Sequence, residues 1–228
     1  MKRTLLAVAL LAVTGAASAA PSLSWAELSE ASPNSAFDPN SGLPYNGTSF
    51  ASSTPVLGSP YGKISLGVLS ATGVGSSGAK VTYTYLGKEA GFQNIFFAPV
   101  STQVWQINTP LFNNSIPAVG STSTNAVASN GALDFKFVGD ASNSAVNGGA
   151  WSTYASIGLI AENYSGSLGT YSFIIGYNDS FSTHNDWDDM VIGVNIAPVP
   201  EPETYAMLLA GLGLMGFVAR RRKQSAKV

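Results

Sequence analysis

Short apolar or alternating runs, separated by turn-forming residues, fill the middle of the chain. In 81–85 and 134–137, apolar or aromatic residues alternate with polar ones, which is the pattern of a strand with one buried face. Clusters of Gly, Asn and Ser separate the runs, and no part of the body has a helical period with end caps. The predicted strands are 63–71, 80–86, 94–98, 103–107, 133–138, 156–162, 170–177 and 190–196.

Many short strands without helices indicate an all-β fold. We expect an antiparallel β-sandwich, with a jelly-roll as the favoured topology. The sandwich should occupy 61–197 as one domain, because no internal repeat divides it. Residues 20–60 are rich in Pro, Ser and Asn, which predicts an extended segment with room for one short strand.

The first 19 residues have the pattern of a secretory signal peptide. Two basic residues precede the apolar run 5–13, which is short for a membrane span. Small residues follow, so signal peptidase should cut before Ala20. The cleavage site is then made by Ala17, Ala19 and Ala20. An uncleaved anchor is the alternative interpretation, and the short run and clear small-residue site argue against it.

The C-terminal segment, 198–223, has three parts in order. The first is a stiff Pro-Glu-Pro sequence, because each proline fixes its own φ and restricts the residue before it. An uncharged apolar stretch with three glycines follows, and it predicts a transmembrane helix over 204–219. A basic cluster comes next, which is typical of a stop-transfer signal whose body faces outward. The residues are Pro200, Glu201 and Pro202, then Arg220, Arg221, Arg222 and Lys223.

These three parts together resemble the PEP-CTERM sorting signal. The resemblance implies cleavage near Pro-Glu-Pro by a membrane-embedded exosortase, and a source among Gram-negative bacteria that make extracellular polysaccharide. It also implies a short stay in the inner membrane, followed by the cell surface or the extracellular matrix. A plain single-pass anchor would share the helix and the arginines but gives no reason for Pro-Glu-Pro. A GPI-type signal would end in its apolar tail, without the basic cluster.

The charge and the cysteine content of the body exclude several classes of partner and chemistry. Between positions 21 and 197 there are four lysines and eleven carboxylates, which gives a net charge of −7. An acidic body repels phosphates, so nucleic acid is not an expected partner. The chain has no cysteine, which excludes disulfides, thiolate metal sites and cysteine nucleophiles.

An acidic cluster between two predicted strands is the densest group of candidate ligands. Four carboxylates and two amides lie within 178–189, and unpaired carboxylates repel one another. Ca²⁺ would remove that repulsion, and Asp179, Asp186 and Asp188 are its candidate ligands. The spacing does not match an EF-hand. A solvated acidic turn whose carboxylates cap backbone N–H groups is the competing interpretation, and both stay open here.

No catalytic residue is assigned. His184 is the single histidine, and nothing around it resembles a nucleophile elbow. Paired carboxylates for glycoside cleavage could come from Glu89, Glu162 and the Asp group, if the fold brought them together. The aromatic residues that could stack on sugars, or simply pack in the core, are Trp105, Trp151, Tyr154 and Tyr164; Trp187 is expected to pack.

We therefore expect an exported, surface-sorted, non-enzymatic structural or adhesive matrix protein. The alternative is a carbohydrate-binding module, with or without calcium, and a polysaccharide hydrolase comes third. Expected partners are signal peptidase, an exosortase, the membrane and extracellular polysaccharide.

Overall fold

The computed structural model describes most of the β-rich body and the C-terminal helix. The described residues are 20–31, 64–88, 93–107, 117–139, 143–149, 155–166, 169–179, 187, 189–200 and 202–225. The predicted signal peptide, 1–19, and most of the predicted extended segment, 20–60, lie outside them.

Twelve strands and one helix are formed by these residues. In chain order they are β1 (Ser22–Ala31), β2 (Ile64–Thr72), β3 (Ala79–Gly87), β4 (Asn94–Phe97), β5 (Gln103–Ile107), β6 (Thr122–Val127), β7 (Gly131–Ala132), β8 (Lys136–Val138), β9 (Ser144–Val146), β10 (Ser156–Gly166), β11 (Gly169–Asn178), β12 (Met190–Pro198) and α1 (Pro202–Ser225).

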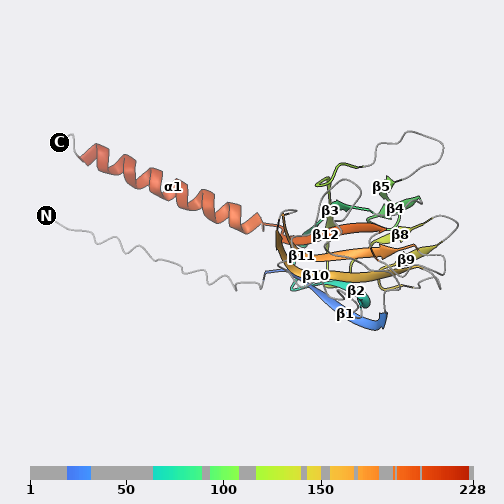
Figure 1. Cartoon of the computed structure of the whole chain (residues 1–228). Coiled ribbons are helices and arrows are strands. Elements are labelled where there is room, and N and C mark those ends of the chain that lie inside the picture. The colour runs from blue at the N-terminus through green and yellow to red at the C-terminus, as the bar shows by residue number, and fades with distance from the viewer. Residues whose placement is uncertain are drawn as a thin grey trace.

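The strands make two antiparallel sheets (Figure 1). The larger sheet has the order β1-β2-β10-β11-β12-β3-β6, with β7 pairing to β2 at the side. The smaller sheet has the order β5-β4-β8-β9. The antiparallel all-β class predicted from the sequence is confirmed, whereas the sandwich and the jelly-roll topology stay predictions.

The main core combines buried residues of both sheets. Phe96 and Phe137 from the small sheet are fully buried and meet aromatic rings of the large one. The ring of Phe137 stacks on that of Tyr177 with centroids 4.9 Å apart, and Phe96 meets Tyr83 edge-on at 5.2 Å. Since the chain has no cysteine and therefore no disulfide, packing contacts such as these have to hold the two sheets together.

A second apolar cluster lies apart from the main core and includes Ile160, Tyr164 and Tyr171 of the β10–β11 hairpin.

Gly176 of β11 lets the backbone at Trp187 approach closely, because a Cβ at position 176 would overlap the Trp187 carbonyl. The Trp187 side chain is itself buried, and its Nε1 donates to Ser156 Oγ at 3.0 Å. The expectation that Trp187 packs is confirmed.

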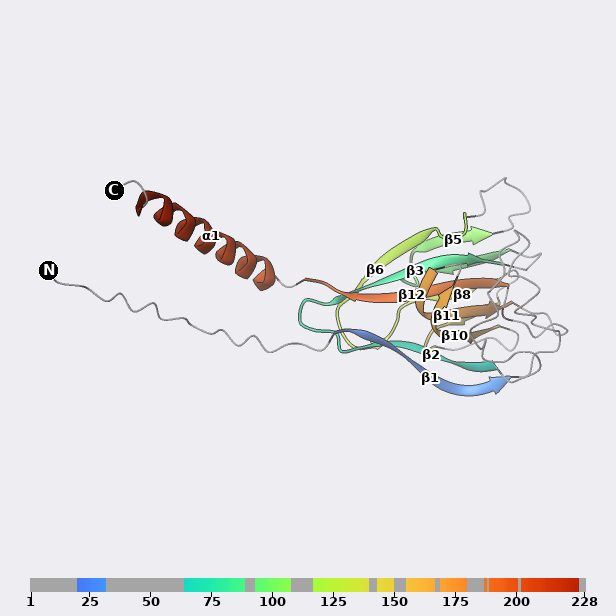
Figure 2. The same cartoon turned by 60° about the vertical axis from the view of Figure 1, so that its left-hand side comes forward.

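The large sheet is nearly interrupted between β2 and β10. These strands pair only through Leu66 with Gly158 and Ser65 with Leu159, and the register of β10 against β11 shifts directly afterwards. By contrast, β1 pairs with β2 along its whole length. The start of β1 comes close to β12, and β12 ends on the side of the body from which α1 extends (Figures 1 and 2).

Each predicted strand overlaps an observed one, and 103–107 coincides with β5. The main difference is β1, which is ten residues long although the sequence was interpreted as extended with room for a short strand. The alternation of Leu23 and Trp25 with serines is the pattern in this segment that is typical of a strand. The edge strand β6 was not predicted, because its Ser, Thr and Asn residues resemble a loop.

The inter-sheet aromatic contact gives the first prediction. Phe137→Ala should lower the free energy of unfolding by about 3–5 kcal/mol, because it removes a buried ring that the neighbours cannot replace. Phe97→Ala is the matched control: Phe97 is partly exposed and lies under Lys136 Nζ at 4.5 Å, so about 1 kcal/mol is expected. Urea unfolding of the full chain measures both, and equal losses would contradict the assignment of the core.

Candidate functional site

The C-terminal tail continues directly from the last strand of the body. After β12 ends at Pro198, Val199 donates its N–H to the Gly78 carbonyl at 3.4 Å, and Pro200 is exposed. Pro202 is the first residue of α1, a position where the missing N–H and fixed φ of proline suit a helix. Glu201 lies outside the described residues. Pro200 is thus an exposed residue of the short connector between the folded body and the helix.

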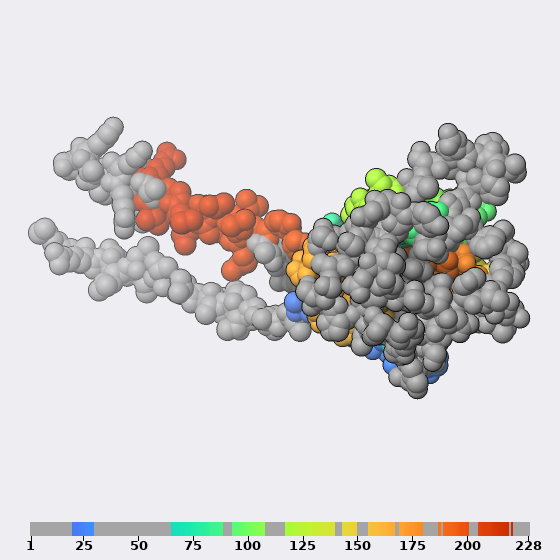
Figure 3. Space-filling view, viewed as in Figure 1, coloured from blue at the N-terminus to red at the C-terminus, as the bar shows by residue number. Residues whose placement is uncertain are grey.

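The helix α1 stands clear of the body (Figure 3). Its apolar side chains are exposed, and consecutive ones such as Met207, Leu208 and Leu209 lie on different faces of the helix. The basic residues predicted as a stop-transfer signal, 220–223, lie in its last turns, and Arg220 is exposed.

The predicted transmembrane helix over 204–219 needs correction. These residues do form a helix, but no helix in the described part of the chain has both the length and the apolar character required to cross a membrane. The physical reason lies in the sequence: the uncharged stretch 205–219 is shorter than the ~20 residues that span a bilayer, and charged residues flank it.

The predicted signal-peptidase cut lies at the same end of the domain as the tail. Ala20 is exposed at the start of the described chain and contacts Gly73, whereas Val199 contacts Gly78. Both glycines belong to the connection between β2 and β3. Cutting before Ala20 would therefore leave the new N-terminus at the end of the domain that carries the Pro-Glu-Pro connector. The other predicted cleavage residues, Ala17 and Ala19, lie outside the described part of the chain.

The acidic region after β11 forms a buried polar link between the two sheets. The Asp179 side chain is only 6% exposed, and its Oδ2 accepts a hydrogen bond from Asn94 Nδ2 of β4 at 2.6 Å. The Asp179 N–H donates to Asp189 Oδ2 at 2.7 Å. One carboxylate does cap a backbone N–H here, as in the competing interpretation, but Asp179 and Asp189 are buried, whereas that interpretation expected a solvated turn.

Two further contacts extend this link. Asn143 donates its Nδ2 to the Asp179 carbonyl at 3.2 Å, and the Tyr177 hydroxyl donates to the Asn143 carbonyl at 2.8 Å. Burial raises the pKa of Tyr177 above its ordinary value, and the nearby Asp179 carboxylate raises it further. Tyr177 therefore stays a neutral hydrogen-bond donor at physiological pH.

Of the three predicted calcium ligands, the structure describes only Asp179, since Asp186 and Asp188 lie outside the described residues. Within the described part, no group of three acidic or histidine side chains could hold a metal ion. The calcium site stays a prediction, and Asp179 has a structural role whether or not a metal binds.

The other candidate residues separate in the structure. Trp105 and Tyr164 are buried, so both pack in the interior and present no ring face to a ligand. Four other candidates lie outside the described residues: Trp151, Tyr154, His184 and Glu89. Glu162 pairs with Phe173 of β11, and Asp179 comes six residues after Phe173, just beyond the end of β11 at Asn178. That is ~20 Å along the strand, well beyond the ~5–9 Å between paired glycosidase carboxylates.

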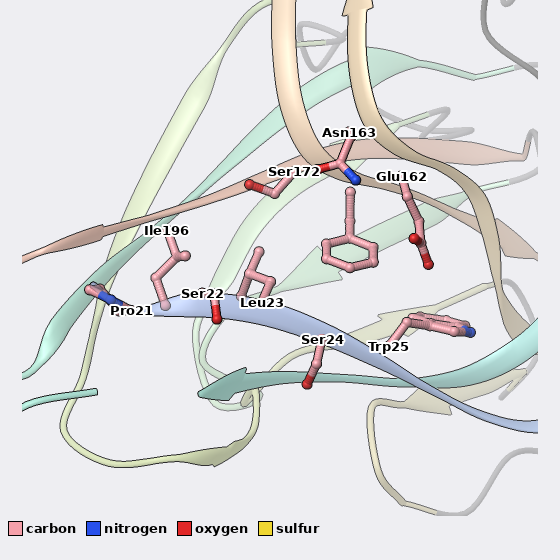
Figure 4. A pocket seen from close by; sticks show the side chains of 10 residues that line it. Pro21, Ser22, Leu23, Ser24, Trp25, Glu162, Asn163, Ser172 and Ile196 are labelled. Atoms are coloured by element: carbon pink, nitrogen blue, oxygen red, sulfur yellow. The ribbon is translucent and has the colours of Figure 1, made fainter. Parts of the chain in front are cut away.

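A cleft of about 480 Å³, which no pattern in the sequence predicts, lies beside the start of β1 (Figure 4). The first residues of β1 form one wall, and the bent β10–β11 hairpin with the end of β12 forms the other. The lining residues are Pro21, Ser22, Leu23, Ser24, Trp25, Glu162, Asn163, Ser172, Phe173 and Ile196. The signal in the sequence was weak, because these residues come from four strands that meet only in the fold.

The exposed connector and the apolar, basic-ended helix together have the form of a C-terminal sorting segment. Residues 198–223 match the family model of the PEP-CTERM protein-sorting motif, which confirms the resemblance seen in the sequence. The motif marks a protein that is sorted to the cell surface by an exosortase. No curated protein and no solved structure matches the chain.

The buried polar link gives the second prediction. Asn94→Asp places a carboxylate against Asp179 in a buried site, and should cost about 3–5 kcal/mol at pH 7. The cost should shrink towards pH 4, where one carboxyl takes up a proton and can donate to the other. Thermal unfolding at the two pH values measures this.

The control is Asn130→Asp. The Asn130 Oδ1 accepts from the Val74 N–H at 2.8 Å at an exposed position, and a carboxylate accepts equally well there. It should change stability little at either pH. Equal losses in both variants, or a loss in Asn94→Asp that grows as pH falls, would contradict the described link.

Proposed function

We propose that the chain is an exported structural or adhesive protein of the cell surface, whose tail is removed by an exosortase after the β-body has folded outside the cytoplasm. The observation that carries this proposal is the PEP-CTERM motif at 198–223, joined to the body by an exposed connector. A protease needs an accessible, extended segment, and Pro200 lies between the end of β12 and the start of α1.

The helix has a part in this proposal that does not require it to cross the bilayer. Its exposed apolar side chains favour contact with lipid or with the membrane-embedded sorting enzyme, and its basic end favours an anionic membrane surface. The helix would hold the uncut chain at the inner membrane until the cut. The body would then reach the surface or the extracellular matrix.

The arrangement of the body supports a role without catalysis. The carboxylates Glu162 and Asp179 are too far apart to act as a pair, and the buried Asp179 is engaged in linking the sheets. Both predicted cut points lie at the end of the body from which α1 extends (Figure 2), so trimming there would leave the strands of the body intact. This supports attachment or matrix formation. The net charge of −7 between positions 21 and 197 does not favour nucleic acid as a partner.

A second candidate function, carbohydrate binding, is favoured by one observation, the polar cleft beside Trp25. A role for calcium in either function stays part of the proposal, and it would involve the region around Asp179. Hydrolysis of polysaccharide is not favoured, because Glu162 is the one carboxylate among the described residues that line the cleft.

The third prediction tests sorting. In a bacterium that has an exosortase, replacing Pro200 and Pro202 by alanine should prevent shortening of the chain, because the stiff connector is lost. The uncut protein should stay with the cell membrane, whereas the wild-type chain is shortened and reaches the surface. Immunoblots of fractionated cells measure size and location together.

Pro117→Ala is the matched control, since Pro117 lies outside the tail, and that variant should be sorted normally. Normal shortening and surface exposure of the double variant would show that Pro-Glu-Pro does not direct the cut. Loss of sorting in the control would instead point to a general folding defect.

A further inference from the structure

The cleft beside β1 exists because the two halves of the large sheet part from each other. With only two residue pairs between β2 and β10, the β10–β11 hairpin is free to bend away. The start of β1 then faces the hairpin across an opening of about 480 Å³, within the usual range for small-molecule sites. The rim reaches solvent, since Ser22, Glu162 and Asn163 are all exposed.

One wall of the cleft has an unusual backbone. Asn163 has φ +49°, the one residue other than glycine with a positive φ in the described part of the chain. It lies within β10, between the ladder pairs Glu162–Phe173 and Tyr164–Tyr171. Asparagine tolerates this left-handed conformation better than most residues, but glycine would tolerate it more easily. Such backbone strain concentrates at functional sites, and here it accompanies an amide on the cleft wall.

The neighbouring hydroxyl is held in place by the next strand. Ser172 lies opposite Asn163, and both its N–H and its Oγ donate to Asn195 Oδ1, at 2.8 and 3.3 Å. The Asn195 Nδ2 in turn donates to the Thr170 carbonyl at 2.8 Å. Because Asn195 is itself held in place, the Ser172 hydroxyl has a fixed orientation, and its oxygen can still accept a hydrogen bond from a ligand. A polar group fixed before binding loses little entropy when a ligand arrives.

Trp25 forms the aromatic end of the cleft, on the same side as Glu162 (Figure 4). Its Nε1 donates to Ser65 Oγ at 2.9 Å, and its ring covers Gly67, where a Cβ would lie only 2.8 Å from the ring atoms. The ring is therefore fixed in orientation, while the side chain as a whole is only partly buried. An indole held in one orientation on the same side of the cleft as a carboxylate offers an apolar contact and a hydrogen-bond acceptor together.

Charge and polarity decide which kind of ligand fits. The lining residues include one carboxylate and no basic side chain, so phosphates and other anions are disfavoured. Leu23, Phe173 and Ile196 supply apolar surface, but the carboxylate, the amide and three serine hydroxyls line the same cleft and would stay unpaired against a purely apolar lipid chain. A neutral ligand with many hydroxyl groups and an apolar ring face suits this combination of an indole, a carboxylate, an amide and serines.

We propose that this cleft binds a short stretch of a neutral polysaccharide, with a sugar ring near Trp25 and sugar hydroxyls on Glu162, Asn163 and Ser172. The inference deepens the adhesive role proposed above, and rests on it only for placing the cleft outside the cell. Binding can be measured on the purified chain, so its failure would leave sorting untouched, and a failure of sorting would leave the cleft untouched.

The fourth prediction tests the cleft. The full chain in mild detergent is titrated with short neutral oligosaccharides of glucose, galactose, mannose and xylose, by calorimetry and tryptophan fluorescence. At least one should bind saturably with Kd below ~1 mM. Glu162→Gln and Asn163→Gly should each weaken that binding about tenfold or more. The first replaces a charged hydrogen-bond acceptor by a weaker neutral one, and the second removes the side-chain amide. Asn163→Gly should fold normally, because glycine accepts the positive φ.

Glu27→Gln is the matched control, since Glu27 is an exposed carboxylate of β1 that does not line the cleft, and it should bind like the wild-type chain. Glu162 is exposed and its amide replacement has the same shape, so this variant keeps the test valid even if Asn163→Gly unfolds. Three results would overturn the proposal: no binding of any neutral oligosaccharide, binding that both cleft variants leave unchanged, or stronger binding of an anionic oligosaccharide than of the neutral ones.

Discussion

The short contact between β2 and β10 is the constraint on which the shape of the body depends. A sheet that is paired along its whole length twists smoothly, whereas one joined by two residue pairs can bend sharply there. The bend allows the start of β1 to approach the end of β12. As a result, the first residue of the expected mature chain and the connector to the tail lie at one end of the domain, with the polar cleft close to both.

The body is held together by packing and by buried amides, because it has no cysteine. The aromatic contact around Phe137 joins the two sheets, and buried polar side chains add hydrogen bonds at the edge of this contact. Asn147 is an example besides Asn94: its amide bonds the N–H and the carbonyl of Leu69 and the carbonyl of Leu133, each at 2.8 Å. Buried amides that satisfy backbone groups in this way fix one arrangement of strands. A domain that must survive outside the cell benefits from such a fixed arrangement.

Some features could be predicted because they depend only on residues that are close together in the sequence. Alternation located strands such as 103–107, and Pro-Glu-Pro with its helix and basic end identified the sorting segment. The cleft could not be found in this way. Trp25 and Asn163 are far apart in the chain, and only the bend in the sheet brings their strands together. The buried role of Asp179 was equally hidden, since its partner Asn94 belongs to the other sheet.

Amide hydrogen exchange along β10 tests the interrupted sheet most directly. In a sheet interrupted in this way, exchange should be slow for the amides of Gly158 and Leu159, where β2 and β11 flank the strand on both sides. Beyond them, in 161–166, amides that point towards β11 should be protected, and those that point away from it should exchange quickly. Uniformly slow exchange over the whole of β10 would mean a continuous ladder with β2, and would contradict the bend and the cleft together.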